Sequence, residues 1–221
     1  MLGSIRERIA VSIMLMLAAG VCNAADVQAT ILDASDKPIV GAVFIVKATN
    51  ASAMSRESSQ SNHATAIMDQ MNKEFVPEVL VIRTGTAVLF PNSDSVAHQV
   101  YSFSTTKRFE LPLYRGRPHP PQIFDKEGVV TLGCNIHDHM VGYIVVTDSP
   151  YFAQSDAQGR ATFKGITAGA YRTSVWHPRF NEQLADQSVN VADGDVRVSF
   201  KLTKPMQPSR SPNKDRRIRD Y

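Results

Sequence analysis

The chain has 221 residues, of which 43% are hydrophobic, and this is enough for one large or two small domains with their own cores. The formal net charge is +3, but the positive charge is concentrated in residues 204–221. The part of the chain between this tail and the first 24 residues is slightly acidic, which gives no electrostatic case for nucleic-acid binding. The tail is also rich in Pro and Ser, and we predict that residues 204–221 are disordered. Its charged residues are Lys204, Arg210, Lys214, Arg216, Arg217 and Arg219 against Asp215 and Asp220.

The first 24 residues have the pattern of a secretory signal peptide. Charged residues at positions 6–8 precede the apolar run Ile9–Gly20, and cleavage is expected after Ala24. The apolar run is too short for a comfortable membrane span, and no later segment is long and apolar enough for one. We therefore expect a periplasmic protein without stable membrane insertion.

Alternating and β-branched segments separated by turn residues dominate the rest of the chain. This pattern is typical of an all-β fold of the sandwich type, and helix signals are nearly absent. The predicted strands are Val79–Ile82, Thr86–Phe90, His98–Ser104, Val129–Cys134, Val141–Thr147, Arg160–Phe163, Ala170–Trp176 and Val196–Leu202.

Two segments near the ends of this β-rich region look like halves of one module. Asp26–Thr49 and Asp156–Leu202 both resemble the carboxypeptidase regulatory-like domain, a small transthyretin-like β-sandwich. The gap between such halves is usually short, whereas here it holds a further β-rich segment. The resemblance implies a second β-domain inserted between strands of the first, with two sequential domains or one merged sandwich as alternatives. The expected limits are residues 25–49 plus 149–203 for the outer sandwich and 60–148 for the central domain.

Cys134 is the only cysteine outside the predicted signal peptide, because Cys22 precedes the expected cleavage site. An unpaired thiol in an oxidising compartment invites oxidation or intermolecular pairing, so its presence favours a metal ligand over an inert buried cysteine. The period-two alternation of Val130, Leu132 and Cys134 predicts that the thiol points into the interior at the end of a strand.

Three further residues of ligand type accompany this thiol. His137 and Met140 follow Cys134 in a tight loop between two predicted strands, so the three side chains can converge. A fourth ligand must come from elsewhere, and His98, at the start of an earlier strand, is the best candidate. Two imidazoles, a thiolate and a weak thioether suit copper in electron-transfer sites. Zinc is less suitable because structural zinc sites do not use Met, and haem is excluded because the Cys-x-x-Cys-His motif is absent.

The residues around this cluster resemble the cupredoxins. Gly128–Val146 is similar to their C-terminal copper-binding hairpin, with the short amicyanin-type Cys-x-x-His-x-x-Met loop. Gly85–Asn92, followed by His98-Gln99-Val100, is similar to the segment that carries the family's first histidine ligand. The resemblance covers residues 64–148, and periplasmic cupredoxin-like methylamine-utilisation proteins look similar over more of the chain. It implies a Greek-key β-sandwich that binds one type 1 copper ion.

Carried over residue by residue, the resemblance makes His98 and His137 the nitrogen ligands, Cys134 the thiolate and Met140 the axial thioether. It also makes His137 the exit for the electron. The chain departs from many cupredoxins by having Gln99 after the first histidine, where they have Asn, and Ile136 before the second, where they have Pro. These positions influence loop stiffness and hydrogen bonding near the thiolate, so they concern the redox potential more than the choice of metal.

Other residues of ligand type have simpler interpretations. We expect His139 to point outward, although as a further nitrogen ligand it would create an open copper site. The stiff, proline-rich surroundings of His119 favour a surface position. Four residues near residues 50–71 either pack in a core or dock Cu(I) on its way to the main site: Met54, His63, Met68 and Met71. Trp176 is expected in the core of the outer sandwich, and His177 is expected to be structural or exposed.

The leading hypothesis is a periplasmic electron carrier that cycles between Cu(I) and Cu(II) and meets its redox partner proteins near His137. The chain has six histidines, too few for the trinuclear cluster of a multicopper oxidase in addition to this site, and a single mature cysteine excludes a paired-thiolate dinuclear centre. We therefore expect no enzyme activity. The alternatives are a copper-binding or delivery protein that does not shuttle electrons, and a structural interaction module in which copper is incidental.

Overall fold

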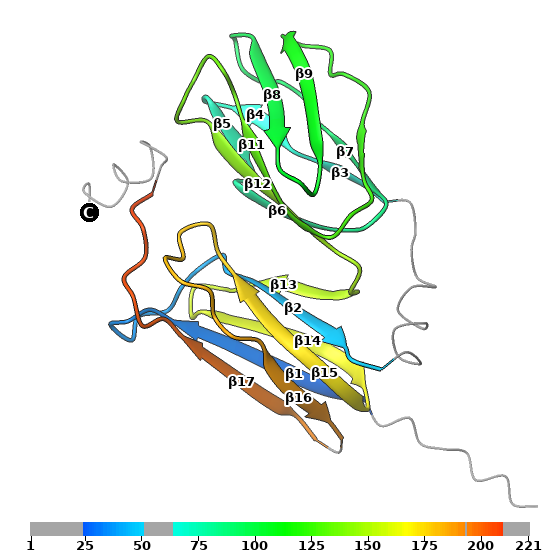
Figure 1. Cartoon of the computed structure of the whole chain (residues 1–221), viewed down its shortest axis with the longest axis vertical. Coiled ribbons are helices and arrows are strands. Elements are labelled where there is room, and N and C mark those ends of the chain that lie inside the picture. Colours follow the sequence, from blue (N-terminus) through cyan, green and yellow to red (C-terminus); the bar gives the residue numbers. More distant parts are fainter. Residues whose placement is uncertain (1–23, 51–63, 193, 210–221) are drawn as a thin grey trace, which may run out of the picture.

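The computed structural model describes residues 24–50, 64–192 and 194–209 (Figure 1). These residues form seventeen β-strands and no helix, so the predicted all-β class is confirmed. No helix among them is long and apolar enough to cross a membrane. The predicted signal peptide, up to residue 23, lies outside the described residues.

The outer sandwich consists of two sheets whose strands come from both ends of the described chain. In β1 every second residue is buried, including Val27, Ala29 and Ile31, because successive side chains of a strand face opposite sides of the sheet. The first sheet has the order β14 (Arg160–Thr167), β1 (Ala24–Leu32), β17 (Val196–Lys201). The second has the order β13 (Tyr151–Gln154), β2 (Val43–Ala48), β15 (Gly169–Trp176), β16 (Gln187–Val191).

The central sandwich consists of a five-stranded sheet, a three-stranded sheet and a short hairpin, all formed by residues 65–147. One buried cluster joins the two larger sheets and includes Val88, Phe124, Leu132 and Ile144. The larger sheet has the order β6 (Val79–Arg83), β12 (Val141–Thr147), β11 (Gly128–Gly133), β8 (His98–Phe103), β9 (Arg108–Tyr114). The smaller has the order β10 (Gln122–Phe124), β7 (Thr86–Leu89), β3 (Thr65–Ile67), and the hairpin is β4 (Asp69–Met71) with β5 (Glu74–Val76).

The two sandwiches are connected in the order that an insertion produces. Among the described strands, β2 pairs only with β13 and β15, which follow the central sandwich in sequence (Figure 1). The exact limits of the two domains stay a prediction.

A small apolar cluster joins the two sandwiches. Val43 of β2 packs with Val145 of β12, and the ring of Trp176 lies edge-on to Tyr143 with the centroids 5.5 Å apart. The structure therefore corrects the expectation for Trp176: its side chain packs at the junction between the sandwiches, because the face of β15 near its end is covered by the central sheet.

The predicted disordered tail also needs a correction at its start. The backbone N–H of Lys204 donates to Glu182, and the backbone N–H of Gln207 donates to the carbonyl of Arg179 at 2.8 Å. Met206 packs against the outer core. Residues 204–209 are thus held on the outer sandwich by hydrogen bonds and apolar contact, while residues 210–221 lie outside the described residues.

Candidate metal centre

Cys134 directly follows β11 and is buried, with 3% of its surface exposed. Val130 and Leu132 on the same strand are buried as well, whereas Thr131 between them is exposed. The alternation predicted from the sequence is confirmed, and it directs the thiol into the core of the central sandwich.

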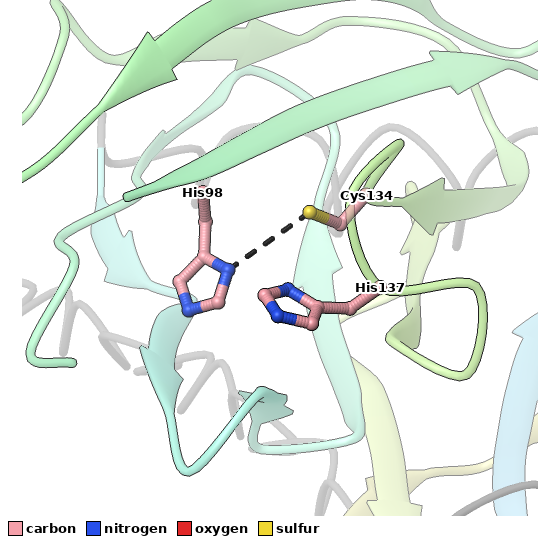
Figure 2. Close-up of side chains that lie close together, drawn as sticks. All are labelled: His98, Cys134 and His137. Carbon is pink, nitrogen blue, oxygen red and sulfur yellow. Dashed lines mark hydrogen bonds between the residues drawn. The ribbon is translucent and has the colours of Figure 1, made fainter. Parts of the chain in front are cut away.

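The strand register brings His98 to this thiol. β8 runs antiparallel to β11 and pairs Tyr101 with Gly133, so the start of β8 at His98 lies beyond the end of β11, beside Cys134. The His98 ring is fully buried, and its Nδ1 lies 3.9 Å from the Cys134 Sγ (Figure 2). Two residues that are 36 positions apart in sequence thus meet through the pairing of two strands.

His137 completes a three-residue cluster. A nitrogen of His98, a nitrogen of His137 and the Sγ of Cys134 all lie within 4.8 Å of one another (Figure 2). The two imidazole rings meet edge-on with their centroids 5.0 Å apart. Donors that bind one ion at about 2.0–2.3 Å lie about 3.5–3.8 Å apart, which is close to the separation of His98 and Cys134.

Met140 closes the loop in which His137 lies. Its backbone N–H donates to the carbonyl of His137 at 2.8 Å, which makes the turn tight, and β12 begins at the next residue. The Met140 side chain is 1% exposed and belongs to the same buried cluster as Cys134. The structure thus places all four residues predicted as ligands at one end of the central sandwich, three of them with their donor atoms in one cluster.

The electrostatics of the cluster suit metal binding. Burial lowers the pKa of His137, and the nearby His98, Lys73 and His139 lower it further, which favours the neutral imidazole that can bind a metal. The Nδ1 atom of His137 is buried and has no hydrogen-bond partner. A buried polar atom without a partner is costly in free energy, and a role of this nitrogen as a metal ligand explains well why it is left unpaired. The donor set of two imidazoles and a soft thiolate fits copper.

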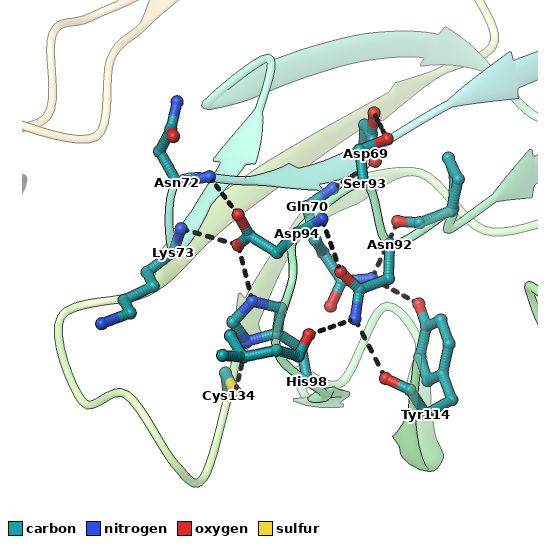
Figure 3. A network of polar contacts seen from close by, with 12 residues as sticks. Asp69, Gln70, Asn72, Lys73, Asn92, Ser93, Asp94, His98, Tyr114 and Cys134 are labelled. Carbon is teal, nitrogen blue, oxygen red and sulfur yellow. Dashed lines mark hydrogen bonds and ion pairs between the residues drawn. The ribbon is translucent and has the colours of Figure 1, made fainter. Parts of the chain in front are cut away.

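The second nitrogen of His98 contacts a carboxylate. Its Nε2 lies 2.7 Å from Oδ2 of Asp94, whose side chain is 13% exposed (Figure 3). Burial opposes the ionisation of Asp94, but the backbone N–H of Lys73, the hydrogen bond with His98 and the backbone N–H of Asn72 together hold its pKa below the ordinary value. The cluster therefore has an anionic partner directly behind one imidazole.

The loop from Phe90 to His98 is itself fixed by buried hydrogen bonds. Asn92 donates through Nδ2 to the carbonyls of Val96 and Tyr114, both at 3.0 Å. The Tyr114 hydroxyl donates to the carbonyl of Phe90 at 2.5 Å and accepts from the Gln70 amide (Figure 3). These bonds hold the segment that leads into β8, and so they fix the position of His98.

The remaining candidates lie outside the cluster, although the ring centroid of His139 is only 6.0 Å from that of His137. His139 is exposed and lines a surface groove with Tyr143 and Arg179. His119 packs edge-on against Tyr114, 4.8 Å between centroids, and its Nε2 lies 3.2 Å from the carbonyl of Pro112.

The methionine-rich segment is only partly described. Met68 is fully buried in the central core, which is the packing role considered from the sequence, and Met71 is 42% exposed. Met54 and His63 lie outside the described residues.

Asp94 was not predicted from the sequence. Asn92 and Asp94 are typical turn residues, and the Asp94 backbone N–H indeed donates to the Asn92 side chain at 3.0 Å. That signal marks a loop but does not name a partner. Asp94 accepts hydrogen bonds from Asn72 and Lys73 in the β4–β5 hairpin. No local sequence pattern reveals this contact.

One end of the central β-sandwich thus holds a His-Cys-His cluster whose donor set fits a blue copper site. No protein-family model and no curated protein matches the chain. Among solved structures, a reduced amicyanin mutant is similar to part of this chain. The alignment covers 40% of this chain and 88% of the amicyanin chain, with 18% sequence identity and a TM-score of 0.34.

Two further solved structures are similar to a comparable share of the chain. A purple cupredoxin from Nitrosopumilus maritimus matches 38% of this chain and 99% of its own, with 29% identity and a TM-score of 0.33. A copper-containing nitrite reductase from Thermus scotoductus SA-01 matches 37% of this chain but only 22% of its own, with 26% identity and a TM-score of 0.35.

Proposed function

We propose that the protein binds one type 1 copper ion through His98, Cys134, His137 and Met140 and carries single electrons between redox partner proteins. The observation that carries this proposal is the cluster itself: two imidazole nitrogens and a thiol within 4.8 Å, one of the nitrogens buried without a partner. When bound, copper supplies a one-electron couple. The signal peptide predicted from the sequence supports a periplasmic location.

The protein's own residues have three tasks in this function. They bind the ion with donors that suit both oxidation states, since thiolate and thioether favour Cu(I) while imidazoles hold Cu(II) equally well. They exclude water, because His98, Cys134 and Met140 are almost completely buried. They also hold the donors in place through the strand pairing and the tight loop, so that little reorganisation accompanies a change of charge.

The surface around His137 is suited to electron exchange. His137 is only partly buried, and its neighbour Ile136 is 52% exposed. A partner that docks over Ile136 would approach the one imidazole of the cluster that reaches toward solvent. We propose His137 as the route for the electron.

A carrier explains this arrangement better than an enzyme does. Metal enzymes keep an open coordination position for substrate, whereas here four protein side chains are proposed as donors and three of these residues are buried. We therefore propose that the centre has no catalytic activity of its own. The slightly acidic charge between the first 24 residues and the tail, and the lack of a long apolar segment, support the further proposal that nucleic acid is not a partner and that the protein is not stably inserted in a membrane.

Reconstitution with Cu(II) tests this function, with Cys134→Ser as the matched variant because serine keeps the shape of the side chain and removes the sulfur. The wild type is expected to bind one equivalent of copper, to show an intense visible band from thiolate-to-copper charge transfer, and to cycle reversibly in voltammetry. The variant is expected to lack the band. A colourless wild type would contradict the proposal, and loss of the metal on each reduction would indicate copper delivery in place of electron transfer.

A further inference from the structure

Asp94 makes more contacts than a residue in an exposed loop needs. Its Oδ1 accepts the backbone N–H of Asn72 at 2.7 Å, and its Oδ2 accepts the backbone N–H of Lys73 at 2.8 Å (Figure 3). Oδ2 also lies 2.7 Å from Nε2 of His98. Both oxygens are therefore engaged, and the carboxylate ties the turn of the β4–β5 hairpin to the buried imidazole.

The backbone of the hairpin is shaped to meet this carboxylate. Asn72 and Lys73 have φ angles of 55° and 60°, in the left-handed region that side chains other than glycine adopt rarely. The two successive N–H groups of this turn point to the same carboxylate. Such a pair of backbone donors fixes the position of the anion, so Asp94 cannot follow small movements of His98.

A fixed carboxylate decides which nitrogen of His98 carries the proton. Because an ionised carboxylate only accepts hydrogen bonds, the Nε2 that faces it must carry the hydrogen. The other nitrogen, Nδ1, then has a free lone pair, and this is the atom that lies 3.9 Å from the Cys134 sulfur (Figures 2 and 3). The imidazole is thus held ready to donate to an ion between His98 and Cys134.

We propose that Asp94 is a positioning residue for the metal ligand His98. It keeps the Nε2-protonated tautomer with Nδ1 directed at the cluster, and its negative charge favours the oxidised ion over the reduced one. The preference for the oxidised ion rests on the proposed copper function. Asp94 favours Cu(II) because Cu(II) carries one more positive charge than Cu(I), and because a hydrogen bond to a carboxylate makes a metal-binding imidazole a stronger donor.

A purely structural role for Asp94 would give different results. If the carboxylate only capped the turn at Asn72 and Lys73, its removal would lower stability without changing the tautomer of His98 or the reduction potential. Asp94→Asn keeps an oxygen that can accept from His98 but removes the charge, and Asp94→Ala removes both. Asp138→Asn is the matched control, since Asp138 is exposed in the loop beside His137 and carries the same charge.

The first measurement uses copper-free protein and nitrogen-15 NMR of the histidine rings. The wild type and Asp94→Asn are expected to show His98 protonated at Nε2, and Asp94→Ala is expected to show a mixture of tautomers. An Nδ1-protonated His98 in the wild type, or an unchanged tautomer in Asp94→Ala, would overturn the positioning role. If Asp94→Ala does not fold, the tautomer of His98 in the wild type and the second measurement decide whether Asp94 positions His98.

The second measurement compares copper affinity and reduction potential. Loss of the outer partner of a metal-binding histidine weakens binding about 10–100-fold. We expect Asp94→Asn to lower the ratio of Cu(II) to Cu(I) affinity about tenfold, which raises the potential by about 59 mV for a one-electron couple. Equal shifts in Asp94→Asn and Asp138→Asn would overturn the effect of Asp94. A wild type that binds no copper would instead overturn the proposed function, while the NMR measurement would still decide the tautomer.

Discussion

Removing one hydroxyl group from Tyr114 tests whether the loop before His98 is held as described. Tyr114 is 8% exposed, and its hydroxyl donates to the Phe90 carbonyl and accepts from the Gln70 amide. Tyr114→Phe leaves both groups without this partner inside the sandwich. A buried polar group that loses its partner costs about 1–3 kcal/mol, so we expect the free energy of unfolding to fall by about 2 kcal/mol.

The pH dependence of this difference gives a sharper test. Burial raises the pKa of Tyr114 to about 12 from an ordinary value of 10. The contribution of the neutral phenol is therefore complete below pH 10 and is lost as the pH rises through 12, since the unfolded chain ionises first. The variant has no phenol to ionise at this position, so the difference between the two proteins should narrow between pH 10 and pH 12.

Denaturant unfolding of the copper-free proteins at pH 7 and at steps up to pH 12 measures both effects. The matched variants share every other titrating group, so their difference isolates Tyr114. A difference near zero at pH 7, or one that stays constant up to pH 12, would refute the reasoning.

Two further substitutions test the centre itself. Met140→Leu conserves volume in the core and should cost less than about 1.5 kcal/mol in the copper-free protein, while the loss of the fourth donor should change the reduction potential and the visible spectrum of the copper-loaded protein. An unchanged potential and spectrum would exclude Met140 as a ligand. Gly133→Ala places a Cβ 2.7 Å from Cζ and Oη of Tyr101 and should lower the free energy of unfolding by about 1–3 kcal/mol. Adding Tyr101→Ala to Gly133→Ala should remove this overpacking, and purely additive costs in the double mutant would contradict it.

The sequence predicted the strands that carry the ligands because their side chains alternate. In β11, the core-facing Val130 and Leu132 alternate with the exposed Thr131, so they repeat with a period of two, whereas in β12 Ile144 faces the core and Val145 packs at the junction between the sandwiches. That period alone is enough to predict that Cys134 points inward. The position of His98 beside the thiol could be proposed only as the best available candidate, because the pairing of Tyr101 with Gly133 is not written in either strand alone.

The strands that were missed include edge strands and strands of only three residues. β9 lies at the edge of its sheet and contains Pro112, so its alternation is interrupted by residues that tolerate solvent. The strands β4 and β5 have three residues each, and the turn between them uses Asn72 and Lys73 in a conformation usually taken by glycine.

The role of Asp94 could not be predicted from the sequence, and neither could the β4–β5 hairpin whose backbone N–H groups bind it. Its role depends on a contact between two loops, and each loop looks ordinary in sequence. The chemistry of the ligands was therefore readable from residue type and spacing, whereas the surroundings that orient them depended on tertiary contacts.

The most direct test of the central claim is X-ray absorption spectroscopy at the copper edge of the Cu(II)-loaded protein. We expect a first coordination shell with one short sulfur and two nitrogen ligands, and the loss of the short sulfur in Cys134→Ser. A shell of nitrogen and oxygen alone in the wild type, or the same shell in both proteins, would contradict a copper centre built on Cys134.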